Sequence, residues 1–112
     1  MKSSLRVISN NSPAMQNAVD AQLKQIIKQA TFAVEGHAKK NAPVDTGNLR
    51  NSIQSTIADN GLRGEVTAHA EYAIYVEMGT VRTPAQPYMM PALRAVLPKL
   101  RSSLRAIGMR LR

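Results

Sequence analysis

The chain has 112 residues, the length of a single domain, so we expect residues 1–112 to fold as one unit. Its 15 Lys and Arg exceed its 7 Asp and Glu, and the net charge of +8 favours an anionic partner such as nucleic acid, an acidic protein face or a membrane surface. The absence of Cys excludes disulfides, thiolate metal sites and thiol nucleophiles. No apolar run approaches the roughly 20 residues that span a bilayer, so we expect no transmembrane segment.

The first part of the chain is dominated by one predicted helix. Residues 1–12 show no periodicity and are expected to form a loose arm, with an extended stretch at residues 5–8 as the alternative. Ser12 and Pro13 favour a helix start, because Ser caps helices and Pro fits the first turn. Apolar residues at three- and four-residue steps then predict an amphipathic helix over residues 13–41, which Pro43 ends. This apolar stripe consists of Met15, Val19, Leu23, Ile26, Ile27, Ala30, Val34 and Ala38.

The middle of the chain predicts a β-hairpin or small antiparallel sheet. Residues 49–52 fit a short helical turn, and alternating, β-branched residues predict strands within residues 53–69. Asp59-Asn60-Gly61 supplies the turn chemistry between the two strands. Residues 72–79 favour a short helix that Gly79 caps, with a continued strand as the alternative, and residues 81–87 form a loop punctuated by Pro.

The end of the chain predicts a basic amphipathic helix over residues 91–110. Its apolar residues step by four and three like a coiled-coil seam, and Pro98 should kink it. The seam either folds onto the first helix or contacts another subunit, since a small core leaves apolar surface for neighbours. Together these elements predict an α+β fold. The seam residues are Leu93, Leu97, Leu100, Leu104, Ile107 and Leu111.

Positive charge is concentrated at the same end of the chain. The last 19 residues contain no acid, and this basic tail is a candidate contact for an anionic partner, with a solvated helix face as the alternative. A small basic DNA-binding protein is therefore one hypothesis for the whole chain, although it lacks a helix-turn-helix signal and interleaved aromatic residues. The basic residues are Arg94, Lys99, Arg101, Arg105, Arg110 and Arg112.

One short motif points to catalysis. Asp45-Thr46-Gly47 is the triplet of dimeric aspartic proteases, but there it must follow a strand so that two carboxylates can share a proton. Here it follows a helical pattern, and we interpret it as a turn that Asp45 caps. His37 and His69 are isolated and make a poor metal site, so we predict no catalytic residue, metal or cofactor.

Three segments, taken in order and spacing, resemble one known family. They are residues 38–53 (AKKNAPVDTGNLRNSI), 72–80 (YAIYVEMGT) and 86–93 (QPYMMPAL). The family is the phage head–tail joining family of long-tailed phages of the lambdoid siphophage type, also described as tail-completion, neck or minor tail-component proteins. We interpret most of the matching residues as fold-defining. They are Asp45, Thr46, Gly47, Leu49, Arg50, Tyr72, Tyr75, Glu77, Gly79, Thr80, Gln86, Pro87, Pro91 and Leu93.

The resemblance implies a structural virion component and not an enzyme. Such a protein of a phage or prophage is assembled in the bacterial host cytoplasm and acts where the DNA-filled head meets the tail. The resemblance also implies a homo-oligomer, commonly a hexameric ring, with neck, connector or tail-tube proteins as partners and DNA nearby. It implies no cofactor, no small-molecule substrate and no membrane partner. The seam residues from Leu97 to Leu111 are the candidate subunit contacts.

Overall fold

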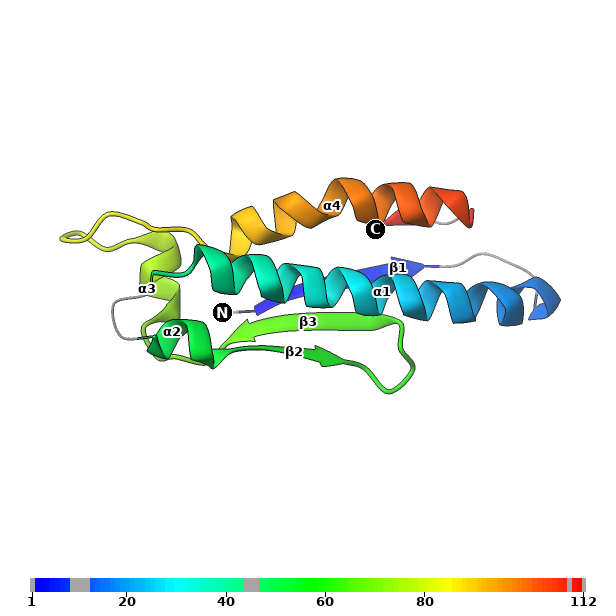
Figure 1. Ribbon diagram of the computed structural model, residues 1–112, viewed down its shortest axis with the longest axis horizontal. Coiled ribbons are helices and arrows are strands. Elements are labelled where there is room, and N and C mark those ends of the chain that lie inside the picture. Colours follow the sequence, from blue (N-terminus) through cyan, green and yellow to red (C-terminus); the bar gives the residue numbers. More distant parts are fainter. Residues whose placement is uncertain (1, 9–12, 44–46, 109, 112) are drawn as a thin grey trace.

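The fold is known from a computed structural model. It describes the backbone of residues 2–8, 13–43, 47–108 and 110–111 and the side chains of residues 19–43 and 47–108. The molecule is elongated, with principal extents of 55 × 23 × 19 Å. Figure 1 shows α1 lying across the sheet and α4 running alongside α1. In chain order the elements are β1 (Lys2–Ile8), α1 (Pro13–Asn41), α2 (Asn48–Ser52), β2 (Ile53–Ile57), β3 (Arg63–Ala68), α3 (Ala73–Met78), α4 (Met89–Ala106) and β4 (Arg110–Leu111).

The strands form one antiparallel sheet in the order β2-β3-β1-β4. β2 and β3 are the predicted hairpin, with Ile53 opposite Ala68 and Ile57 opposite Gly64. Residues 2–8 form β1, in register with β3 from Lys2 opposite Thr67 onward. The prediction of a loose arm is therefore wrong for these residues, and the alternative of an extended stretch at residues 5–8 is confirmed. The partner of β1 lies some 60 residues away in the sequence, so the local pattern of residues 1–12 does not reveal it.

The core lies between α1, α4 and the inner face of the sheet. α1 makes its most extensive contacts with α4 and also packs against β2 and β3. The approach of α1 to β3 is close, because a methyl group added at Gly64 would lie 1.8 Å from Thr31 Oγ1. The most deeply buried side chains include Leu23, Ile27, Val34, Ile53, Tyr88, Met89 and Leu104. The architecture confirms the predicted α+β fold, and α1 confirms the predicted helix over residues 13–41.

The last helix differs from the predicted one in its ends and in its buried face. α4 begins at Met89 instead of Pro91, ends at Ala106, and continues through the exposed Pro98. Its buried residues step by four from Ala92 to Leu104, so the buried stripe turns gradually around the helix, because each step advances about 40° beyond one full turn. Leu93, Leu97 and Ile107 are partly buried against this core, and the side chain of Leu111 lies outside the described residues.

The burial of α4 decides between the two alternatives for the predicted seam. Leu100 and Leu104 are 2% and 0% exposed, and they pack in the core of their own chain. The seam therefore folds onto α1 at these residues and does not offer them to another subunit. Within the described part of the chain, no helix is both long and apolar enough to cross a membrane.

Candidate protein interface at the α3 end

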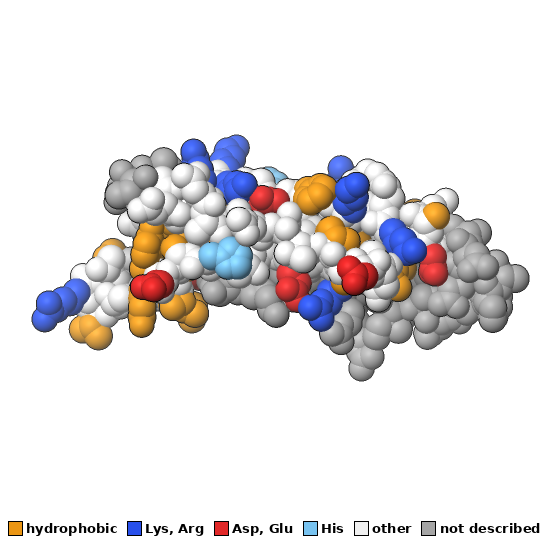
Figure 2. Space-filling view, turned by 90° about the horizontal axis from the view of Figure 1, so that it is seen from below, with side chains coloured by type: hydrophobic (Ala, Val, Ile, Leu, Met, Phe, Trp, Pro, Cys, Tyr) orange, Lys and Arg blue, Asp and Glu red, His pale blue; other side chains and the backbone are white. Residues whose placement is uncertain are grey.

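Exposed apolar side chains gather at one end of the molecule. This α3 end consists of Tyr72, α3, the loop of residues 79–88 and the first turn of α4. Among the described side chains, it holds all the large exposed hydrophobic residues except Phe32. Figure 2 shows hydrophobic side chains concentrated there. Met78 is 72% exposed and Val81 is fully exposed, and the other members are Tyr72, Ile74, Tyr75 and Met90.

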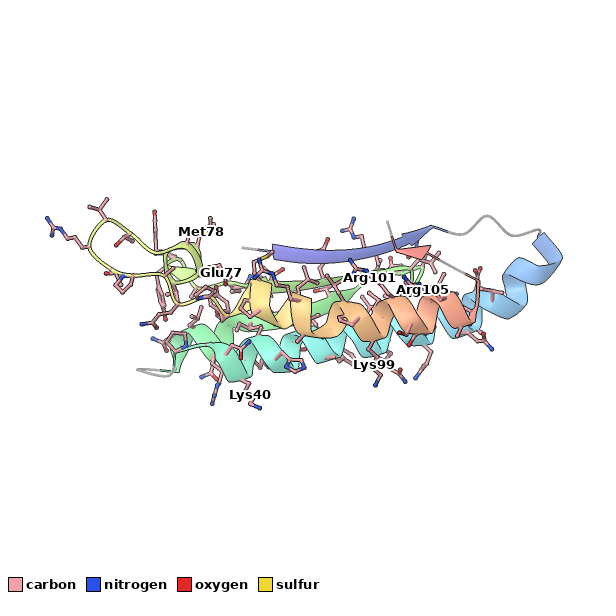
Figure 3. The ribbon with its side chains drawn as sticks, turned by 90° about the horizontal axis from the view of Figure 1, so that it is seen from above. Lys40, Glu77, Met78, Lys99, Arg101 and Arg105 are labelled. Atoms are coloured by element: carbon pink, nitrogen blue, oxygen red, sulfur yellow. The ribbon has the colours of Figure 1, made fainter. Side chains whose placement is uncertain are left out.

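A buried carboxylate fixes the geometry of the α3 end. Glu77 is only 4% exposed, and its Oε1 accepts hydrogen bonds from the backbone N–H groups of Tyr88 (3.0 Å) and Met89 (2.8 Å). Its Oε2 accepts a third from Met90 at 3.2 Å. These N–H groups begin α4 and have no partner within the helix, and the positive end of the helix dipole favours a negative charge there. Glu77 therefore joins α3 to the start of α4 (Figure 3).

Backbone hydrogen bonds close the loop between α3 and α4. The N–H of Gln86 donates to Val76 O at 2.8 Å, and the N–H of Thr80 donates to Thr83 O at 2.8 Å. Gly79 has a φ of +79°, and a Cβ there would lie 2.7 Å from Ala85 N, so the loop requires glycine at this position. The apex at Val81 is thus presented on a hydrogen-bonded frame.

Tyr88 is the second link between α3 and α4. Its side chain is fully buried, and its hydroxyl donates to Ala73 O at 3.0 Å. Burial, with a further contribution from the nearby Glu77 charge, raises the pKa of Tyr88 to about 12. Asn41 Nδ2 also donates to Tyr88 O at 3.4 Å, which ties the end of α1 to the same point.

The Asp-Thr-Gly segment follows α1 in the chain. Asp45 and Thr46 fall outside the described residues, so the predicted cap is not tested. Gly47 has a φ of +76° at the start of α2 and Leu49 is buried. Arg50 Nε donates to Lys39 O in the last turn of α1 at 3.1 Å, which satisfies a carbonyl that the helix leaves free. The segment follows a helix and not the strand that a protease requires.

The first and second family segments meet at a groove of about 270 Å³. Pro43 and Leu49 come from the first segment, and Tyr72, Tyr75 and Val76 from the second. The third segment contributes Gln86 to the groove, and its Pro91 lies in the first turn of α4. The three segments are therefore adjacent in space, and among their residues Glu77, Thr80 and Gln86 form hydrogen bonds within the α3 end.

The basic residues lie apart from this cluster. Arg94, Lys99, Arg101 and Arg105 are exposed on α4, and the side chains of Arg110 and Arg112 lie outside the described residues. His37 and His69 are exposed and belong to different elements. Among the described side chains, no group of three or more His, Asp or Glu residues is placed to hold a metal ion.

Two features of the α3 end were not predicted from the sequence. The exposure of Ile74, Met78 and Met90 is not among the predictions, although their place beside a Pro-rich loop was the available signal. Glu77 was interpreted only as a family residue, because the helix that it caps begins twelve residues later. Local capping patterns extend over three residues and do not reveal such a cap.

The comparisons with known proteins agree with the resemblance seen in the sequence. A model of the HK97-gp10-like family, described as "Bacteriophage HK97-gp10, putative tail-component", matches residues 8–79. This range contains the first family segment and all of the second except Thr80, and it covers more than half of the chain. No curated protein and no solved structure matches the chain. The chain therefore belongs to the HK97-gp10-like family of bacteriophage tail-component proteins, which are structural proteins of the phage.

Proposed function

We propose that this protein is a non-enzymatic component of the phage head–tail junction that completes the tail as one subunit of an oligomeric ring. The observation that carries the proposal is the set of six large apolar side chains exposed on a hydrogen-bonded frame at the α3 end. In this proposal the surface binds a neighbouring subunit or another neck, connector or tail-tube protein. Assembly takes place in the bacterial host cytoplasm.

The composition of the α3 end supports a protein contact. Exposed apolar clusters on monomers mark interaction sites, and the centres of interfaces are enriched in Tyr, Met and Arg. Tyr72, Tyr75 and Met78 lie in or beside α3, and Arg82 stands exposed at the loop apex next to Val81. Because the loop is already closed by its own hydrogen bonds, binding does not have to order it, which favours affinity.

The experiment measures the molar mass of the purified protein by light scattering over a range of concentrations. We expect a closed oligomer of defined mass, and ring-shaped particles in negative-stain images. The variant Met78→Ser/Val81→Ser should shift the protein towards monomer while its circular dichroism spectrum stays that of the wild type. Phe32→Ser is the matched control, because Phe32 is 48% exposed but lies on α1 outside the α3 end.

Two results would contradict the proposal. One is a wild-type protein that stays monomeric at high concentration and binds none of the neck, connector or tail-tube proteins of its phage. The other is an oligomer that Phe32→Ser weakens as much as Met78→Ser/Val81→Ser does, since this would place the contact elsewhere.

A further inference from the structure

The arginines of α4 form a row on the side of the helix that faces away from the core. Arg94, Arg101 and Arg105 are seven and four residues apart, which at 100° per residue places them within about 40° of one another. The buried residues Met89, Ala92 and Val96 lie on the opposite side, while the buried Leu100 and Leu104 lie about 120° and about 80° from the centre of the row. With a rise of 1.5 Å per residue the row is about 16 Å long.

Neither α4 itself nor any ion pair among the described side chains supplies an acid to this row. The sequence of α4 contains no Asp or Glu. Among the described side chains, the two ion pairs join Lys39 to Glu35 and Arg63 to Glu65, and neither involves α4. Figure 3, viewed from above onto α4, shows Lys99 and Lys40 on the α1 side of the helix and Arg101 and Arg105 at its other edge, towards β1. The charged side chains that α4 presents are therefore all positive.

We infer that the outer face of α4 binds the phosphate backbone of double-stranded DNA through Arg94, Arg101 and Arg105. Guanidinium groups match phosphate oxygens with two parallel hydrogen bonds, and a row of such groups follows a row of phosphates. A duplex carries one charge per about 1.7 Å of its axis, so a row about 16 Å long faces several phosphates at once. Contacts of this kind bind any sequence.

Two other anionic partners fit this face less well. Single-stranded nucleic acid is bound by aromatic side chains on which bases stack, and α4 contains no aromatic residue. The centres of protein interfaces are more apolar than their rims, but between the arginines the outer face carries Pro98 and Ser102, with only the partly buried Leu97 at its edge. Duplex DNA requires neither feature. The inference is independent of the proposed ring, because a single α4 carries the complete row.

The test measures binding of the full-length protein to a labelled DNA duplex of mixed sequence by fluorescence anisotropy, between about 50 and 200 mM salt. The variant is Arg101→Gln/Arg105→Gln. Its matched control is Lys24→Gln/Lys28→Gln, which removes the same charge from two exposed residues, also four apart, on α1. Circular dichroism of all proteins verifies that the fold is unchanged.

We expect the wild type and the Lys variant to show the same steep salt dependence. In the Arg variant the slope of log K against log salt should fall by about 2, roughly one for each arginine that no longer neutralises a phosphate. At the lowest salt its affinity should fall about tenfold or more. The light-scattering mass should stay that of the wild type, so that a failure of this inference is distinguishable from a failure of the proposed ring.

Three outcomes would overturn the inference. They are undetectable binding of the wild type at low salt, an equal loss of affinity in the Arg and Lys variants, and binding to polyglutamate as tight as to DNA. The second outcome would show that the affinity for DNA depends only on the net charge of the protein. The third would show that this face binds an acidic protein.

Discussion

The two surfaces of this molecule are built in opposite ways. At the α3 end, apolar side chains stand on a frame that joins α3, a loop and the start of α4 through Glu77 and Tyr88. On the outer face of α4, charged side chains stand on one continuous helix, and no described residue forms an ion pair with them. The first surface depends on a precise tertiary arrangement, whereas the second requires only that α4 is helical and packed against α1.

This difference predicts different physical behaviour for the two surfaces. An apolar contact depends on shape and changes little with salt, while a row of exposed charges acts at a distance and is screened within about 10 Å at 0.1 M salt. Disturbing the frame should therefore damage the α3 end and spare DNA binding. Removing charge from α4 should weaken DNA binding and leave the α3 end intact.

The largest expected effect is that of Glu77→Ala, which breaks the frame. It leaves three N–H groups at the start of α4 without their acceptor and should lower the free energy of unfolding by about 3 kcal/mol. Urea unfolding followed by circular dichroism measures the loss. Glu71→Ala, an exposed residue just before α3, is the control and should change stability little. Equal stability of the two variants would show that Glu77 does not hold the frame.

Tyr88→Phe should produce a smaller loss at neutral pH, about 1 kcal/mol, because one buried hydrogen bond to Ala73 O disappears. In the wild type the pKa of Tyr88 is raised from 10.0 to about 12, so the folded state keeps a proton that the unfolded state releases. Stability should therefore fall as pH rises from about 10 to about 12, and more steeply in the wild type than in Tyr88→Phe. Thermal melts across this pH range measure the difference, and parallel curves would contradict it.

A hydrogen bond between α1 and β2, which belongs to neither surface, should contribute less to the free energy of unfolding. Ser55 Oγ donates to Glu35 Oε1 at 2.6 Å, and this hydrogen bond, together with Lys39, lowers the pKa of Glu35. The link therefore stabilises the fold at pH values above the ordinary carboxyl pKa of 4.5, and its contribution is lost as pH falls through the lowered value. Ser55→Ala should cost about 0.5 kcal/mol at pH 7 and nothing measurable in acid, which urea unfolding at both pH values determines.

The smallest effects on stability are expected on the two surfaces themselves. Val81→Ser and Arg101→Gln should each change the free energy of unfolding by less than about 0.5 kcal/mol, because both side chains are exposed. Their effects should appear in assembly for Val81 and in DNA binding for Arg101. Loss of stability comparable to that of Glu77→Ala in either variant would show that the surface serves the fold and is not free for a partner.

The sequence predicts the α4 surface better than the α3 end. Charged residues without neighbouring acids are visible in the sequence, and helical spacing places Arg94, Arg101 and Arg105 on one face. The long α1 and the hairpin were also predictable, because each has a local period and its own turn residues. The role of Glu77 was not, since its partners begin eleven residues later. The pairing of β1 with β3 was missed for the same reason, because β3 lies far along the chain.

The central claim is that the α3 end contacts another protein of the assembled particle. A photo-cross-linking amino acid placed at Val81, the fully exposed apex of the loop, tests this claim most directly in cells that produce the phage. We predict a cross-link within particles, to a second copy of this chain or to a neighbouring neck or tail protein, and little from the same group placed at Phe32. Equal cross-linking from both positions, or none from Val81 in particles that contain the protein, would contradict it.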